Sequence, residues 1–166
     1  MFITKESDYA VRIIRALSQN TKRSARELCE EELVPRQYGY KILKKLEKAG
    51  LLRCYRGAAG GYALAKPSAA ITLFDVLDAV DDALLFTECL EHGFSCPLNR
   101  GGKECGIHQE FARIQKLIIA VLKGKSLAEI FAPDMLRKMS GKAKARSPRG
   151  SRNWDDDSFS KPLAEL

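Results

Sequence analysis

The sequence lacks any long apolar stretch. No apolar run among its 166 residues approaches the roughly 20 that a membrane-spanning helix needs. The first residues, Met-Phe-Ile-Thr-Lys-Glu-Ser-Asp-Tyr, also lack the long apolar core of a signal peptide. We therefore expect a cytoplasmic protein, whose five cysteines lie in a reducing compartment where metal or redox roles are more common than disulfides.

Motifs of catalysis are also missing. There is no P-loop and no glycine-rich nucleotide fingerprint after a strand, and the two histidines are isolated from any nucleophile. No Cys-x-x-Cys pair supports a thiol-redox enzyme. The sequence therefore predicts that the protein is not an enzyme.

Acidic residues are outnumbered, with 21 Asp and Glu against 28 Lys and Arg, a net charge of +7 and a pI near 9.2. A basic balance favours polyanionic partners such as nucleic acid or anionic lipid. A basic but merely well-solvated protein is the alternative that charge alone leaves open.

A basic helix followed by a glycine-rich hairpin is the most informative pattern. The spacing predicts a helix over Gln37–Ala49 that ends at Gly50. Strand-forming residues within Arg53–Ala65 then flank a glycine-rich turn at 57–61, which is typical of a β-hairpin. This order is that of a winged helix-turn-helix, in which the helix enters the DNA major groove and the hairpin reaches over the backbone.

The predicted DNA contacts fall into three groups. Side chains near the start of the helix can reach base edges, lysines along it suit phosphates, and the wing tip can reach the minor groove or a phosphate. Tyr38, at helical spacing to Ile42, is expected to pack inward. The predicted DNA-binding residues are Arg36, Gln37, Tyr40, Lys41, Lys44, Lys45, Arg56 and Gly60. The alternative for the lysines is a solvated helix face.

Further helices surround this unit. Helices are expected from a Thr4 cap to about Ser18, over 25–32 behind a Ser24–Glu27 capping box, from Thr72 to about Asp81, over Ile107–Lys123, and behind a Ser126–Glu129 box to about Phe131. The helix over Ile107–Lys123 carries an apolar stripe too wide for a lone helix, which predicts self-pairing into a homodimer.

We therefore predict a mostly α fold with one small β-hairpin, a winged helix-turn-helix plus a long dimerisation helix. The predicted domains are a DNA-binding domain (1–82), a cysteine-containing sensor loop (83–106), a dimerisation helix with a short C-terminal helix (107–139) and a disordered tail (140–166).

Three cysteines and a histidine have the spacing Cys-x6-Cys-x8-Cys-x2-His, at Cys89, Cys96, Cys105 and His108. Thiolates are soft ligands for zinc or for an iron–sulfur cluster. Structural zinc sites use closer Cys-x2-Cys pairs, so the spacing argues against zinc. Three unrelated free thiols are the remaining alternative.

Three stretches resemble the Rrf2 family of bacterial winged-helix regulators, which has IscR-like and NsrR-like members. They are Thr-Lys-Glu-Ser-Asp-Tyr-Ala-Val-Arg at 4–12, Leu-Glu-Lys-Ala-Gly-Leu-Leu-Arg-Cys-Tyr-Arg-Gly-Ala-Ala-Gly-Gly-Tyr-Ala-Leu at 46–64, and Ile-Thr-Leu-Phe-Asp-Val-Leu-Asp-Ala-Val at 71–80. The resemblance covers roughly residues 1–135, and its Arg-Gly-x-x-Gly-Gly-Tyr wing is specific for the family.

The resemblance implies a homodimer that binds a palindromic operator in double-stranded DNA and senses redox state, nitric oxide or iron–sulfur status. Cys89, Cys96 and Cys105 would be the ligands of a 2Fe-2S or 4Fe-4S cluster. His108 falls where IscR-like members place a histidine ligand, and it is the preferred fourth ligand. The alternative is Asp8 of the partner subunit, where NsrR-like members supply an acidic ligand. Alternative functions are a cluster-free winged-helix regulator and a protein-interaction module with a structural zinc.

Overall fold

The computed structural model of the chain describes residues 3–19, 21–57, 60–81, 85, 87–91, 93–94, 96 and 105–132. Met1–Pro133 form one compact unit and Asp134–Leu166 a second, and every described residue belongs to the first. The predicted disordered tail (140–166), most of the predicted sensor loop (83–106) and two residues of the wing turn (58–59) lie outside the described residues.

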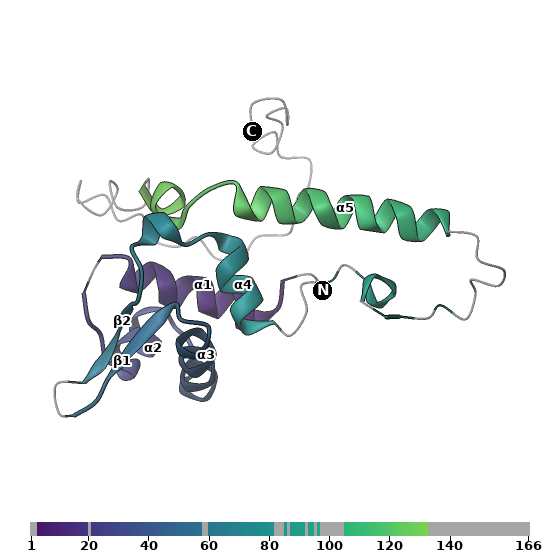
Figure 1. Cartoon of the computed structure of the whole chain (residues 1–166). Coiled ribbons are helices and arrows are strands. Elements are labelled where there is room, and N and C mark those ends of the chain that lie inside the picture. Colours follow the sequence, from purple (N-terminus) through teal and green to yellow (C-terminus); the bar gives the residue numbers. More distant parts are fainter. Residues whose placement is uncertain are drawn as a thin grey trace, which may run out of the picture. The chain divides into compact units, whose positions relative to one another are not determined.

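Helices dominate the described chain, with one two-stranded antiparallel hairpin (Figure 1). The structure thus confirms the predicted mostly helical fold with a small hairpin. The elements in chain order are α1 (Lys5–Leu17), α2 (Ala25–Glu31), α3 (Arg36–Lys48), β1 (Leu52–Tyr55), β2 (Gly61–Leu64), η1 (Ser68–Ala70), α4 (Leu73–Val80), η2 (Glu88–Leu90) and α5 (Gly106–Lys123).

Short-range hydrogen bonds define where most of these helices begin. Thr4, Ser24 and Thr72 cap α1, α2 and α4 in reciprocal capping boxes, each with the residue three positions on. Ser126 and Glu129 make the same pair of bonds at the start of the helical residues 127–132. The capping boxes expected at Ser24, Thr72 and Ser126 are therefore confirmed.

A single apolar core lies between α1, α3 and α4. The inward face of α3 is fully buried in it, and the residues after α5 close it. Burial of this face fixes which side of α3 is free, because the residues between the buried positions must point outward. The fully buried large side chains are Ile13, Ile14, Leu17, Leu28, Ile42, Leu43, Leu46, Ile71, Val76, Val80 and Leu127.

Close packing of α2 on α3 depends on Gly39. A Cβ atom built on Gly39 would overlap Sγ of Cys29, which lies on the facing side of α2. Glycine inside a helix costs about 1 kcal/mol relative to alanine. At this position the cost is offset because the two helices approach closely.

The hairpin pairs Leu52 with Leu64 and Tyr55 with Gly61, and it is extended by one bridge to the chain before α2. In that bridge Arg23 and Tyr62 exchange two backbone hydrogen bonds, of 3.0 and 2.7 Å. A Cβ on Gly61 would lie 2.6 Å from the Arg23 carbonyl oxygen, so this close pairing requires glycine. The wing is thereby anchored to the entrance of α2.

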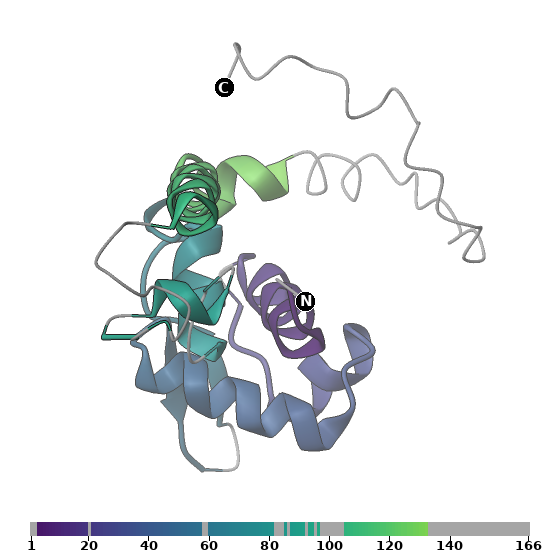
Figure 2. The ribbon, with the colours of Figure 1, turned by 90° about the vertical axis from the view of Figure 1, so that its right-hand side faces the viewer.

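The chain after α5 returns to the core. The Leu127 amide donates to the Ile71 carbonyl at 2.8 Å, and Thr72 and Ser126 form an isolated β-bridge. Helix α5 packs against α4 (Figure 1, and Figure 2 along a perpendicular view). At this contact Nζ of Lys123 lies 4.1 Å from the centre of the Phe74 ring. The long helix is thus connected directly to the winged helix-turn-helix.

The inward packing predicted for Tyr38 is wrong. Its side chain is 40% exposed, and its ring lies 6.0 Å from the ring of Tyr9 on the surface. The reason is its neighbour Gly39, which occupies the inward position where α2 comes closest. Tyr38 therefore lies at the border between core and outer face.

Candidate nucleic-acid interface

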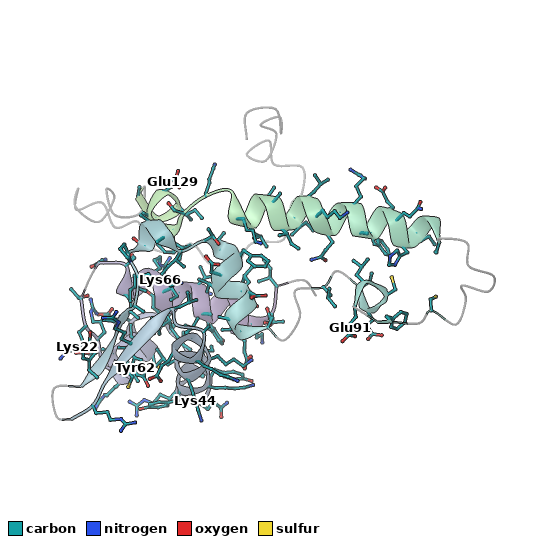
Figure 3. The ribbon with its side chains drawn as sticks, viewed as in Figure 1. Lys22, Lys44, Tyr62, Lys66, Glu91 and Glu129 are labelled. Atoms are coloured by element: carbon teal, nitrogen blue, oxygen red, sulfur yellow. The ribbon has the colours of Figure 1, made fainter. Side chains whose placement is uncertain are left out.

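The outer face of α3 is exposed along its first half. Arg36, Gln37 and Tyr40 are exposed, with 54% of Tyr40 accessible. The opposite face is locked in the core, so α3 presents these side chains to a partner without rearranging. Lys44 also projects outward, on the side away from α5 (Figure 3). This geometry suits insertion into a major groove.

Two of the predicted DNA-binding lysines share an acidic partner on α1. Nζ of Lys41 lies 2.8 Å from Glu6, and Nζ of Lys45 lies 3.1 Å from the other carboxylate oxygen. Lys45 also donates to the backbone carbonyl of Val80, at the end of α4. The hydrogen bond from Lys41, followed by that from Lys45, lowers the pKa of the Glu6 carboxyl below its usual value.

The exposures separate the roles of these lysines. The Lys41 side chain is 61% exposed and can reach a phosphate, whereas the Lys45 side chain is 27% exposed and is turned toward the body of the protein. Glu6 was not among the residues singled out from the sequence. Its contact with Lys45 joins positions 39 apart, so no local pattern could have revealed it.

Arg36, the first residue of α3, is hydrogen-bonded to Glu30 near the end of α2. Arg36 Nη2 donates to Oε1 of Glu30 at 2.9 Å, and Arg26 Nε donates to the same oxygen at 2.9 Å. These two guanidinium groups, Arg26 first, hold the pKa of Glu30 below its usual value. As with Glu6, no local sequence pattern marks Glu30 as part of this surface.

The wing adds a second basic surface. Arg56 is exposed beyond β1, and Nζ of Lys22 lies 5.6 Å from the centre of the Tyr55 ring. Gly60 donates its amide to the Gly57 carbonyl at 2.9 Å, and a Cβ there would overlap the Tyr55 carbonyl oxygen. The described part of the turn therefore needs glycine at 60 for its shape. In Figure 3, Lys22 lies beside the hairpin and Lys44 lies on α3, at the two ends of the candidate interface.

The predicted metal ligands are divided between η2, the chain that follows it and the start of α5. Cys89 lies on η2 and is half-buried, as is Cys96, whereas Cys105 is the exposed N-cap of α5 and His108 lies in its first turn. Among the described residues no three His, Cys, Asp or Glu side chains are gathered as a metal site. The donor types fit an iron–sulfur cluster, but the described geometry does not bring the three thiols together.

Asp8, the alternative fourth ligand, has a partner within its own chain. Its carboxylate lies 2.5 Å from Nη2 of Arg12, one turn further along α1, and its side chain is 49% exposed. It is accessible on the surface of α1.

Helix α5 keeps much of its apolar stripe in solvent. Ile107 is 66% exposed, Leu117 54% and Val121 57%, and in α5 Gln115 alone is buried. None of the helices in the described part of the chain has the length and apolar character needed to cross a membrane.

Comparison with known proteins identifies the family. Residues 3–133 match the sequence model of Rrf2, described as an iron-dependent transcriptional regulator. The chain belongs to the Rrf2 family. It is similar to Protein aau3 of Rhizobium meliloti (32% identity over 133 residues, 78% of this chain and 84% of that protein) and to the transcriptional regulator IscR of Klebsiella pneumoniae (26% over 145 residues, 86% of each).

The fold is also that of solved Rrf2 structures. The structure of CymR (YrzC), the global cysteine regulator of B. subtilis, superposes with a TM-score of 0.64 at 22% identity, covering 79% of this chain and 96% of that one. Rrf2 proteins are DNA-binding transcription regulators and are not enzymes, so the predicted family, fold class, DNA partner and absence of enzymatic activity are confirmed.

Proposed function

We propose that this Rrf2 protein is a homodimeric regulator that binds a palindromic operator. We further propose that it senses redox state, nitric oxide or iron–sulfur status through a bound iron–sulfur cluster. The observation that carries the DNA part of this proposal is the outer face of α3, which is basic and exposed beside the wing while its inner face is fixed in the core. The domain boundaries predicted at 82, 106 and 139 remain part of the proposal.

The DNA-binding residues divide by position on this surface. Arg36, Gln37 and Tyr40 lie at the N-terminal end of α3, where a recognition helix reads base edges. Lys41 and Lys44 face outward for phosphates, and Arg56 extends the contact along the wing. The remaining two predicted residues support the structure of the interface: Gly60 forms the wing turn, and Lys45 connects α3 to Glu6 of α1.

The homodimer is supported by α5. Its exposed apolar side chains lie on one stripe of the helix, and burying such surface contributes about 25 cal/mol per Å². A two-fold axis lets the same stripe of each subunit cover the other. Two copies of α3 can then face successive major grooves on one side of a duplex.

For the sensor, we propose Cys89, Cys96 and Cys105 as cluster ligands, with His108 as the fourth. His108 lies in the first turn of α5, three positions after the Cys105 N-cap. The alternative fourth ligand is Asp8 of the partner subunit. When bound, the cluster would supply iron that reacts with oxidants or nitric oxide. The three cysteines lie in the chain between α4 and α5, so a cluster held there would affect both the DNA-binding unit and the dimer helix.

The wide spacing of the cysteines favours, as a second candidate, a cluster-free regulator of the same fold. Purification without oxygen, followed by iron analysis and visible absorption, separates the two. Iron with absorption in the visible range, lost in the Cys96→Ala variant, supports the cluster. Colourless protein without iron that binds its operator normally removes the sensor and leaves the DNA-binding proposal intact.

Salt titration on duplex DNA tests the DNA-binding part. Binding through about six phosphate contacts should weaken with a slope near −5 in log affinity against log salt. A protein-interaction module would show neither this steep dependence nor a preference for one duplex sequence. That result would overturn the proposed DNA contacts of α3 and the wing.

A further inference from the structure

We propose that Glu30 positions the guanidinium of Arg36 for reading a base and so determines how strictly each half-site is recognised. The inference rests on the proposed function, because it takes Arg36 as a base-reading residue. It adds an acidic residue of α2, outside the recognition helix, to the set that determines specificity.

The contact joins α2 to the start of the recognition helix. Arg36 is the first residue of α3, and its Nη2 donates to Oε1 of Glu30 at 2.9 Å. Nε of Arg26, one turn before Glu30 on α2, donates to the same oxygen at 2.9 Å. The carboxylate is therefore fixed between two guanidinium groups rather than free to follow one of them.

Fold stability does not account for this arrangement. The side chains of Arg26, Glu30 and Arg36 are 71%, 52% and 60% exposed, and ion pairs so exposed contribute little to folding. A carboxylate beside a DNA-facing helix also repels phosphates and lowers affinity for any duplex. Because Glu30 lowers the affinity for DNA and adds little stability, we infer that its role is to orient the guanidinium of Arg36.

Orientation matters because arginine recognises guanine with two parallel hydrogen bonds, to O6 and N7. Glu30 accepts from Nη2 alone and takes one of its two hydrogens. Among the described residues the other Nη2 hydrogen is therefore left for a base edge, beside the hydrogen of Nε or of Nη1 with which it forms a parallel pair. A held guanidinium loses less freedom on binding, and its direction selects the base that it fits. A guanidinium released from Glu30 can turn to the nearest phosphate, which carries no sequence information.

The test uses the full-length protein and a library of duplexes with randomised sequence. After selection, affinities are measured for the best duplex and for its single-base-pair variants. In Glu30→Gln, the preference at one base pair of each half-site should fall about 5- to 20-fold. Affinity for unrelated duplexes should rise, because one negative charge is removed.

Glu31→Gln is the matched control. It removes the same charge from the adjacent position of α2, but Glu31 pairs with Arg23 beside the hairpin. It should raise affinity for unrelated duplexes and keep the preference at every base pair. Arg36→Ala should lose the same preference as Glu30→Gln, and adding Glu30→Gln to Arg36→Ala should change it no further.

Several results would overturn the inference. They are an unchanged base preference in Glu30→Gln, an unchanged preference in Arg36→Ala, or an equal loss of affinity for all duplexes together with a lowered melting temperature. If the unmodified protein selects no sequence at all, the proposed function itself fails. The failure of the inference is therefore distinguishable from that of the function on which it rests.

Discussion

At the scale of single residues, Glu6 connects three helices. It lies on α1, binds Lys41 and Lys45 of α3, and Lys45 in turn holds the last carbonyl of α4. Replacing Glu6 by glutamine should lower the free energy of unfolding at pH 7 by about 1–2 kcal/mol, because its charged hydrogen bonds are lost. The ammonium group of Lys45, whose side chain is only 27% exposed, would then have no carboxylate partner.

The same carboxylate predicts a pH dependence. Its pKa is lower in the folded protein than the usual 4.5, so its contribution to stability is complete above pH 4.5 and is lost as the pH falls through the folded pKa. The difference between the protein and Glu6→Gln in urea unfolding should therefore shrink below pH 4.5. A difference that stays constant down to pH 3 would contradict this role of Glu6.

Leu33 is held in a backbone conformation that suits glycine. It has φ of +53° between α2 and α3, and its side chain is 65% exposed, so little packing compensates for the strain. Leu33→Gly should raise the free energy of unfolding by about 0.5–1 kcal/mol.

The reverse change is the matched control. Gly50 has φ of +71° after α3 with no atom near its missing Cβ, so Gly50→Ala should destabilise by about 1 kcal/mol through the backbone alone. Thermal melts of both variants measure the two effects. Destabilisation by Leu33→Gly would show that the leucine side chain matters more than its backbone conformation.

At the scale of elements, the distance between α2 and α3 is set by one missing methyl group. Gly39→Ala should destabilise by about 1–3 kcal/mol, because its Cβ would overlap Cys29 Sγ. Cys29→Ala removes that sulfur, so the double variant should return to within about 1 kcal/mol of the original stability, helped by the better helix propensity of alanine. Urea unfolding of the two single variants and the double variant tests this, and additive losses would contradict it.

Elements with local signals could be predicted from the sequence, and contacts between distant residues could not. The capping boxes at Ser24 and Thr72 and the glycine-rich hairpin act over a few residues, so the helix starts and the wing were predictable. The Glu6–Lys45 pair links α1 to α3, and the turn that places Leu33 at positive φ has no glycine to mark it.

The candidate site follows the same division. Which face of α3 is exposed was predictable from helical periodicity, because Ile42, Leu43 and Leu46 recur on one side. The exposure of Tyr38 was not, since it depends on how closely α2 approaches Gly39. The role of Glu30 was also hidden, because it requires the relative placement of α2 and Arg36. The cysteine ligand set remains a prediction.

At the scale of the whole molecule, the proposed homodimer would determine whether two copies of α3 can bind one operator together. Val121 is 57% exposed on the apolar stripe of α5, so Val121→Asp would place a carboxylate inside the proposed dimer interface. Since a desolvated, unpaired charge is costly, this variant should be monomeric at micromolar concentration in analytical ultracentrifugation. It should also bind a palindromic operator at least 100-fold more weakly, because a monomer reads one half-site.

Ala120→Asp provides the comparison, because it introduces the same side chain at the preceding position of α5, which is also exposed and lies about 100° around the helix from Val121. It should remain dimeric and keep its affinity for the operator. If both variants sediment as dimers, the stripe of α5 is not the interface, and the exposed Leu117 and Ile107 must be covered in another way. If Val121→Asp is monomeric and still binds the full operator tightly, the two copies of α3 do not bind it as a pair.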